Sequence, residues 1–351
     1  MGAIERISVV APMRGESNGN LTGFVADLAT QDYAGELEVL VADGGDCDCA
    51  HLQAEAERHG IELRLIDNPE GWVSPGLNAC IRAASGDLIV RLDCHSRYPG
   101  DYLRRCAEVA ESSGAWNVGG RLVPRGETPF EQSVATAMDS PFGGIGWTRL
   151  GDSDEPVEVD TVTFGAFRPD AFEAAGLFDE ELVRNQDDEF NLRLRRAGGK
   201  IVLDPSITVE YRPRGSLRAV WRQYFEYGFW KVPVMRKHGQ VLTLRSLAPL
   251  ILVLSVAVLA GGAPASALAR RLLVGEAAAY LSLALFFGTT GVRRRGGPLS
   301  SIFSVVATFP AFHFGYGTGM ASSLLRLARE RLSSSRDTGP APAPTADVAP
   351  R

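Results

Sequence analysis

Strand-like and helix-like segments alternate over the first 92 residues, and this alternation limits the fold of the chain more than any other feature. Short apolar runs, typical of buried strands, are separated by segments with helical spacing and by turn residues. The predicted strands are residues 7–11, 37–42, 62–66 and 88–92, and the predicted helices are residues 21–30, 50–59 and 75–84. This order predicts a Rossmann-like, doubly wound α/β half.

The signals become weaker in the following stretch of the chain. A looser section runs from about residue 96 to residue 160, and a strand is then predicted over residues 161–167. Helices are predicted over residues 169–175 and 189–197. We expect this second half to build the acceptor side of a ligand site, so residues 1–238 are predicted to form one α/β domain.

The composition changes abruptly after His238, where three apolar segments follow one another. Residues 247–262 contain no charged side chain, residues 272–288 contain only Glu276, and residues 299–325 contain no Asp, Glu, Lys or Arg. Apolar segments of this kind are typical of membrane helices. The sequence therefore predicts a membrane-associated, transmembrane helical region after the α/β domain.

The arrangement of this region, residues 239–332, stays open. The first two segments are about seventeen residues long, which is short for a span, so buried or re-entrant helices are an alternative. Arginine clusters lie between and after the segments, and three full spans cannot place all of them on the cytoplasmic side. Residues 333–351 are rich in Pro, Ala and Ser and are predicted to form a disordered tail.

Composition and charge exclude several classes of protein. The net charge of −6 argues against a nucleic-acid partner, because binding to a phosphate backbone needs clustered excess Lys and Arg. The five cysteines form no disulfide framework, and the N-terminus does not resemble a secretory signal, so a reducing, cytoplasmic setting is expected. Cys47 and Cys49 are interpreted as free thiols; a zinc site is the alternative, although no second pair with zinc spacing follows.

Two acidic sites indicate chemistry on a nucleotide-activated substrate. Asp93 and His95 follow the apolar strand 88–92, and ligand sites in open α/β sheets gather at the carboxyl ends of strands. About ninety residues later, Asp187 lies in a run of three acidic residues beside a predicted helix. The first site is predicted to bind a metal and a nucleotide, and the second to supply a catalytic base.

The loops after the first two strands make this interpretation specific. Pro12 and Glu16 follow the first strand, and Asp43 precedes a glycine pair after the second. Together with the two acidic sites, these residues resemble the family 2 inverting glycosyltransferases, which have the GT-A fold. The resemblance implies that Pro12, Glu16 and Asp43 hold the nucleotide, with Asp43 accepting hydrogen bonds from its base. Taken alone, Asp43 could instead be a turn residue before glycine.

The resemblance assigns further positions to the donor. Residues 68–79 resemble the family's loop and helix before its metal-binding strand, which implies that Asn78 faces the nucleotide. Asp93 and His95 take the place of the family's usual Asp-x-Asp, where carboxylates and Mg²⁺ or Mn²⁺ neutralise the leaving diphosphate. Both residues are therefore implied metal ligands, and the histidine suits Mn²⁺ better than Mg²⁺.

The resemblance also implies a catalytic base. Gln186 and Asp187 match the family's Glu-Asp motif, so Asp187 is expected to take the proton of the acceptor hydroxyl in an inverting transfer. Glu189 is expected to favour the helix start, where acidic residues suit the helix dipole. Gly165 matches the glycine of the strand below the donor sugar, where a missing side chain allows close approach.

The motifs together are similar to the succinoglycan-type exopolysaccharide glucosyltransferases of the bacterial inner membrane. This implies transfer of a hexose, most simply glucose, from a UDP-sugar to a polyprenyl-diphosphate-linked saccharide, with the catalytic domain in the cytoplasm and the apolar helices in the lipid bilayer. Residues 222–230 take the place of the Gln-x-x-Arg-Trp helix of processive synthases but match it poorly. A processive synthase and a non-catalytic nucleotide-sugar-binding scaffold are the alternatives.

Overall fold

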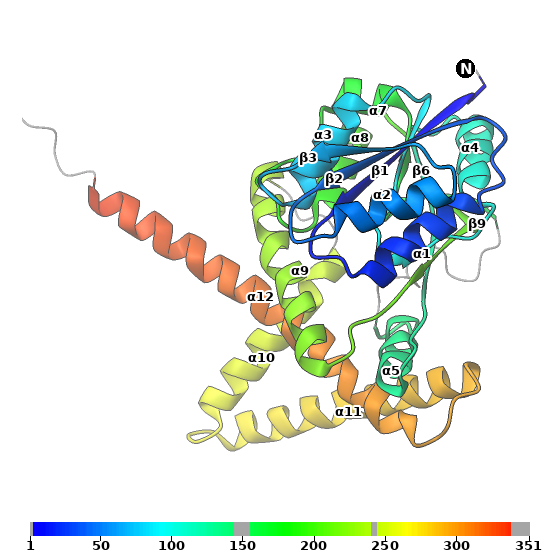
Figure 1. The fold of residues 1–351 in the computed structure, drawn as a ribbon. Helices are drawn as coiled ribbons and strands as arrows, with labels where there is room; N and C mark the ends of the chain where they lie inside the picture. The colour runs from blue at the N-terminus through cyan, green and yellow to red at the C-terminus, as the bar shows by residue number, and fades with distance from the viewer. Residues whose placement is uncertain (1–2, 144–154, 240–243, 338–351) are drawn as a thin grey trace, which may run out of the picture.

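A nine-stranded mixed sheet forms the centre of the protein, whose computed structural model describes residues 3–143, 155–239 and 244–337 (Figure 1). The strands are β1 (Arg6–Met13), β2 (Glu36–Asp43), β3 (Leu63–Asp67), β4 (Leu88–Arg91), β5 (Ser96–Arg97), β6 (Asn117–Pro124), β7 (Val157–Glu158), β8 (Ala166–Phe167) and β9 (Ile201–Tyr211). The helices are α1 (Asn18–Ala29), α2 (Cys49–Arg58), α3 (Val73–Ala83), α4 (Tyr102–Ser113), α5 (Pro129–Met138), α7 (Pro169–Ala175), α8 (Gln186–Arg196), α9 (Leu217–His238), η1 (Leu244–Leu247), α10 (Ala248–Gly262), α11 (Ala267–Arg294) and α12 (Ser301–Asp337).

The strand order places a topological switch beside β1. The order is β3-β2-β1-β4-β8-β6-β9-β5, and β7 pairs with β9. The four strands β1 to β4 are parallel, whereas β8 runs antiparallel to both β4 and β6. The chain moves outward from β1 to β3 and then crosses to β4 on the other side of β1, and ligands bind at such a crossing in open α/β sheets. The predicted α/β, Rossmann-like half is confirmed.

Helices cover both faces of this sheet, which explains why its inner strands are continuous apolar runs. On one face, Val9 of β1 packs in a core with Leu21 of α1. On the other face, Val10 of β1 and Leu40 of β2 pack with Leu77 of α3. These side chains are fully buried, so the first half of the sheet is a rigid support for the loops at its edge.

The predicted strand over residues 161–167 is wrong for most of its length, since β8 contains only Ala166 and Phe167. Phe164 has a φ of 54°, and this left-handed conformation cannot continue an extended strand. Thr161 instead accepts a hydrogen bond from Nδ2 of Asn191 at 2.8 Å. The segment is thus a buried loop tied to α8.

The apolar part of the chain gathers at one end of the sheet domain (Figure 1). Among the described residues, two helices are long and apolar enough to cross a membrane: Arg245–Gly262, which includes α10, and Ala267–Arg294, which is α11. They contain the predicted segments 247–262 and 272–288. The third predicted segment, 299–325, lies in α12 from residue 301 onward, and Phe309 and Phe312 of this helix are buried in the protein.

The end of α12 bears on the predicted tail. The helix continues to Asp337, so residues 333–337 of the tail predicted to be disordered are helical. Residues 338–351 lie outside the described part of the chain. In Figure 1 the red, C-terminal part of α12 extends away from the sheet domain.

The sheet domain and the apolar helices share one core. Val134 of α5, Tyr224 of α9, Ala284 of α11 and Phe309 of α12 belong to the same buried cluster. The carboxylate of Asp139, which follows α5, accepts hydrogen bonds from two arginines at the end of α11, at 3.3 and 3.0 Å. The domain boundary predicted at residue 238 coincides with the end of α9, but packing continues across it.

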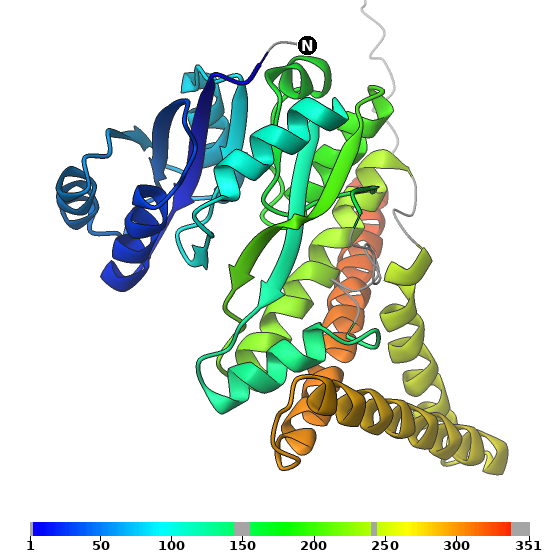
Figure 2. The ribbon, with the colours of Figure 1, turned by 90° about the vertical axis from the view of Figure 1, so that its right-hand side faces the viewer.

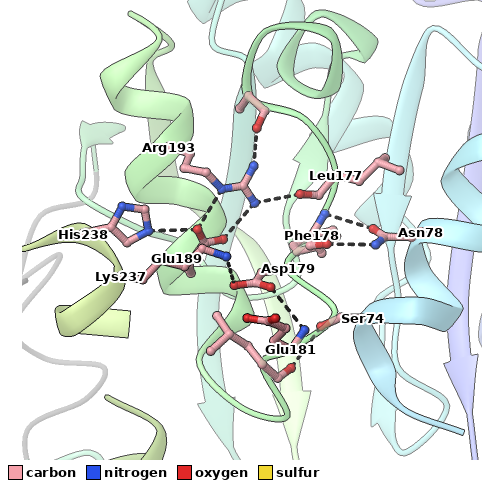
Figure 3. A network of polar contacts seen from close by, with 12 residues as sticks. Ser74, Asn78, Leu177, Phe178, Asp179, Glu181, Glu189, Arg193, Lys237 and His238 are labelled. Atoms are coloured by element: carbon pink, nitrogen blue, oxygen red, sulfur yellow. Dashed lines mark hydrogen bonds and ion pairs between the residues drawn. The ribbon is translucent and has the colours of Figure 1, made fainter. Parts of the chain in front are cut away.

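A buried ion network fixes the orientation of α8 (Figure 3). Glu189, in the first turn of α8, is fully buried, and its carboxylate accepts two hydrogen bonds of 2.8 Å from Arg193. One of its oxygens lies 2.9 Å from Nε2 of His238 at the end of α9. Arg193 also donates to the carbonyls of Ala175 and Leu177. Helix α8 is therefore tied both to the loop after α7 and to α9.

Arg193→Met should destabilise the protein by about 3–5 kcal/mol, because Glu189 would keep a buried negative charge without its main partner. The free energy of unfolding, measured by urea denaturation, checks this. Arg195→Met is the matched control, since Arg195 is exposed on the same helix. It should change stability by less than about 0.5 kcal/mol. Equal small effects of both substitutions would contradict the role of the network.

Candidate active site

A buried arginine joins the two acidic sites. Arg91, the last residue of β4, is only 5% exposed. Its Nη1 lies 2.6 Å from Oδ1 of Asp187, and its Nε lies 3.2 Å from Oδ1 of Asp93. Asp93 and Asp187, far apart in the sequence, therefore share one cation at the carboxyl end of β4.

The surroundings of Arg91 favour a charged arginine and a basic carboxylate. Burial alone would lower the pKa of Arg91, but the charges of Asp187 and Asp93 outweigh it and raise that pKa. Burial raises the pKa of Asp187 above that of an ordinary aspartate, and Arg91 only partly opposes this effect. A carboxylate with a raised pKa is a stronger proton acceptor, which is what a general base needs.

Asp187 is positioned by the start of α8. Asn185, the residue before the helix, has a φ of 62°, and this left-handed conformation turns the chain sharply into its first helical turn. From the sheet side, Asn191 of α8 accepts a hydrogen bond of 2.7 Å from the amide of Asn117 in β6. The helix that carries Asp187 is thus anchored to the same sheet that carries Arg91.

Glu16 and His95 form a second polar pair at this edge of the sheet. Nδ1 of His95 lies 3.2 Å from Oε1 of Glu16, and Asn20 donates to Oε2 of Glu16 at 2.7 Å. Burial would raise the pKa of Glu16, but the hydrogen bonds from His95 and Asn20 outweigh it, and the pKa is lowered. The same hydrogen bond to Glu16 raises the pKa of His95. Glu16 therefore holds the ring of His95 in a fixed orientation.

Pro12 and Asp43 also lie at this edge. Pro12 pairs with Ala42 in the register of β1 and β2, and Asp43 follows at the end of β2. Oδ1 of Asp43 accepts a hydrogen bond from the backbone of Gly45 at 2.9 Å, and the Cys49 thiol donates to Oδ2 at 3.1 Å. Asp43 thus stabilises the Asp-Gly turn, and its contact with a nucleotide base stays a prediction.

Asn78 joins α3 to the loop after α7. It is buried in α3, where its amide exchanges two hydrogen bonds of 2.9 Å with the backbone of Phe178 and donates to Glu180 at 2.7 Å. These bonds hold the loop after α7 against α3 (Figure 3). The predicted contact of Asn78 with the nucleotide stays a prediction.

Gly165 lies directly beside Arg91. Its carbonyl accepts a hydrogen bond of 3.1 Å from the backbone N–H of Arg91. A Cβ at this position would lie 2.3 Å from Oδ1 of Asn117 and 2.6 Å from the ring of Phe167. Packing alone therefore requires glycine here, and contact with a donor sugar stays a prediction.

Sequence reasoning passed over Arg91 and Phe164. Arg91 could have been found from sequence, because a charged residue inside an apolar strand must have a buried partner of opposite charge. Phe164 could not, since nothing in the sequence marks a bulky residue with a positive φ. Its ring lies 5.6 Å from the Arg91 guanidinium and covers it.

Comparisons with known proteins identify the class of enzyme. Residues 8–174 match the family model described as glycosyl transferase family 2. The chain is 29% identical over 298 residues to the succinoglycan biosynthesis protein ExoA of Rhizobium meliloti (strain 1021). The aligned residues cover 83% of this chain and 87% of the relative. Residues 8–174 are a glycosyltransferase family 2 domain. The protein is a glycosyltransferase.

A second relative of this glycosyltransferase is the dolichyl N-acetyl-alpha-D-glucosaminyl phosphate 3-beta-D-2,3-diacetamido-2,3-dideoxy-beta-D-glucuronosyltransferase of Methanococcus voltae. The two chains are 25% identical over 261 residues, which cover 71% of this chain and 80% of the relative. The relatives thus match far more than residues 8–174, so the likeness extends into the second half of the sheet.

Solved structures confirm the fold of this glycosyltransferase. The mannosyltransferase PcManGT from Pyrobaculum calidifontis, solved with GDP-Man and Mn²⁺, aligns with a TM-score of 0.60 at 20% identity over 88% of this chain and 87% of its own. Residues 1–349 of TarS from S. aureus align with a TM-score of 0.50 at 15% identity over 92% of both chains. The predicted GT-A fold is confirmed.

Arg91→Met should slow sugar transfer by this glycosyltransferase by about 100-fold or more, because Asp93 and Asp187 would lose the cation that fixes their geometry. Arg91→Lys keeps the charge but loses the fork of donors, so it should retain more activity. Initial rates with detergent-purified protein check this. A normal rate for Arg91→Met, at an unchanged melting temperature, would contradict the proposed role of the bridge.

Proposed function

We propose that the protein transfers a hexose from a nucleotide-sugar to a saccharide acceptor with inversion, at a site that uses a divalent metal. The observation that carries this proposal is the Arg91 bridge. It brings Asp187, a carboxylate with a raised pKa, next to Asp93 at the topological switch of the sheet. An inverting transfer requires a base for the acceptor hydroxyl and a positive site for the leaving diphosphate.

Asp93 and His95 would hold the metal, as Mn²⁺ or Mg²⁺. Within residues 3–143, 155–239 and 244–337, no group of three or more His, Cys, Asp or Glu side chains could hold a metal alone. The two residues fit a site that diphosphate oxygens and water complete, as is usual for Mg²⁺. Glu16 engages Nδ1 of His95, which fits binding through Nε2 with a carboxylate orienting the ring. The bound ion would neutralise charge on the leaving diphosphate.

The remaining residues bind and orient the reactants. Pro12 and Asp43 are proposed to hold the nucleotide at the ends of β1 and β2, and the backbone at Gly165 is proposed to lie below the sugar. Asp187 takes the proton of the acceptor hydroxyl while the hydroxyl oxygen of the acceptor attacks the anomeric carbon. The bond to the diphosphate breaks on the opposite face, and the diphosphate leaves with the electron pair. Arg91 keeps the Asp187 carboxylate in place during this step.

The donor is proposed to be a UDP-hexose, most simply UDP-glucose, and the acceptor a polyprenyl-diphosphate-linked saccharide of exopolysaccharide or cell-surface glycan synthesis. The name of the ExoA relative supports this assignment. The apolar helices also support a lipid-linked acceptor, because side chains such as Val258 (72% exposed), Val274 (68%) and Phe303 (79%) form a surface that a bilayer would cover. We place the protein in the bacterial inner membrane with its sheet domain in the cytoplasm.

Calorimetric titration of UDP into the purified protein, with and without Mn²⁺, tests the donor site. Binding should require the metal and should be lost in Asp93→Ala, because the diphosphate would lack its cation. Addition of a chelator should reverse the binding. Metal-independent binding that survives Asp93→Ala would overturn the metal assignment, and no binding of UDP at all would favour another nucleotide or the scaffold interpretation.

Asp187→Asn should lower the rate of transfer by about 10² to 10⁴-fold while UDP binding is retained, because only the proton acceptor is removed. In the unaltered enzyme, kcat should fall as the pH falls through the pKa of Asp187. Because that pKa is raised, the fall should begin at a higher pH than for an ordinary aspartate. A pH profile of kcat and the anomeric configuration of the product check these points. An α-linked product from an α-linked donor would refute inversion.

A further inference from the structure

Helix α9 holds the turn that carries Asp187. Four side chains around Asp187 contact this one helix, whereas Asp187 itself contacts Arg91. The pairs are Arg184 with Glu226 at 3.1 Å, Asn185 with the carbonyl of Tyr227 at 2.9 Å, Asp188 with Lys231 at 2.5 Å, and Glu189 with His238 at 2.9 Å. The turn is thus fixed from two directions, by the sheet through Arg91 and by α9.

Lys231 makes the central contact of this set. It is 9% exposed, and its ammonium lies against the carboxylate of Asp188, the residue next to Asp187. A buried charge stays in place only with its partner, so the pair fixes the distance between α9 and the turn. Lys231 and His238 are two helical turns apart and lie on one face of α9.

On a different face, the backbone of α9 comes close to the backbone of α12 at three glycines. A Cβ at Gly315 of α12 would lie 3.0 Å from the carbonyl oxygen of Trp221, and one at Gly319 would lie 2.1 Å from that of Phe225. A Cβ at Gly228 of α9 would lie 2.0 Å from the backbone of α12. The two helices therefore touch backbone to backbone, an arrangement in which a single methyl group forces them apart. In Figure 2, the orange and red α12 runs alongside α9.

The same part of α12 also receives α10. A Cβ at Gly317 would lie 2.2 Å from the carbonyl oxygen of Pro249, at the start of α10. Helix α10 is one of the two candidate membrane spans. A continuous series of close contacts therefore runs from α10 through α12 and α9 to the turn that carries Asp187.

We infer that α9 is a positioning element for the catalytic base, that Lys231 is its positioning residue, and that the glycine contact between α9 and α12 sets the position of α9. Through α9, the apolar helices affect the position of Asp187 and so the rate of the chemical step. This role is additional to the apolar surface that they provide. The residues proposed to hold the donor lie at the carboxyl ends of β1, β2 and β4, so the affinity for the donor should not depend on the contact between α9 and α12. This inference rests on the proposed function, because it takes Asp187 as the base.

Kinetics of full-length variants test the role of Lys231. Lys231→Met should lower kcat by about tenfold or more, with the KM for the donor unchanged within about twofold, because the base moves and the donor site does not. Lys231→Arg, which can still pair with Asp188, should recover most of kcat. Lys237→Met is the matched control. Lys237 lies on the same helix but pairs with Asp179, which is outside the turn that carries Asp187. Loss of this pair should leave kcat unchanged.

Gly319→Ala tests the contact with α12. Its new methyl group meets the α9 backbone, so kcat should fall with donor KM retained, although the residue is remote from Asp187. Gly275→Ala is the control, since a Cβ there meets nothing within 4 Å. Normal kcat in both Lys231→Met and Gly319→Ala, with Asp187→Asn inactive, would overturn the inference and leave the proposed function intact. Should Gly319→Ala fail to fold, the Lys231 series decides: parallel losses of kcat and donor affinity would indicate a merely structural role.

Discussion

The geometry of this enzyme depends on the buried Arg91, whose positive charge must be balanced by nearby carboxylates. Arg91 cannot be solvated where it lies, and removing a charge from water costs several kcal/mol unless partners replace the water. Asp93 and Asp187 are these carboxylates, and each in turn depends on Arg91. The loop after β4 and the start of α8 are therefore folded as one unit. The left-handed residues Phe164 and Asn185 lie next to this unit, which is where strained backbone is usually tolerated.

The first half of the fold could be predicted from sequence because its inner strands, β1 and β4, are buried on both faces. A run such as residues 88–92 is apolar at every position except Arg91, and such runs mark parallel strands between helix layers. The second half could not be predicted equally well. Its loop at residues 161–165 is held by the side chain of Asn191 and by a positive φ at Phe164, and neither leaves a periodic pattern.

That Asp93 and Asp187 belong to one site was predictable, because one follows a buried strand and the other begins a helix. Both contact Arg91 in the structure. A resemblance to a family motif does not show which of the matching residues the fold itself also requires. Asn78 and Gly165 resemble donor-binding positions and also serve the fold, since Asn78 bonds to the loop at Phe178 and Gly165 packs against Asn117. The near absence of charged side chains likewise marks residues 247–262, 272–288 and 299–325 alike, because it does not distinguish a helix that faces lipid from one whose glycines face another helix.

The core shared by α5, α9, α11 and α12 has a consequence for how such enzymes can diversify. In a modular protein, recombination can attach a catalytic unit to a new anchor through a linker. Here the exchangeable unit includes the glycine face of α12 and the arginines at the end of α11 that bind Asp139. A hybrid that joins this sheet domain to foreign helices would have a poorly packed interface between the two parts. Proteins with this architecture should therefore diverge by substitutions within this interface rather than by exchange of all their apolar helices.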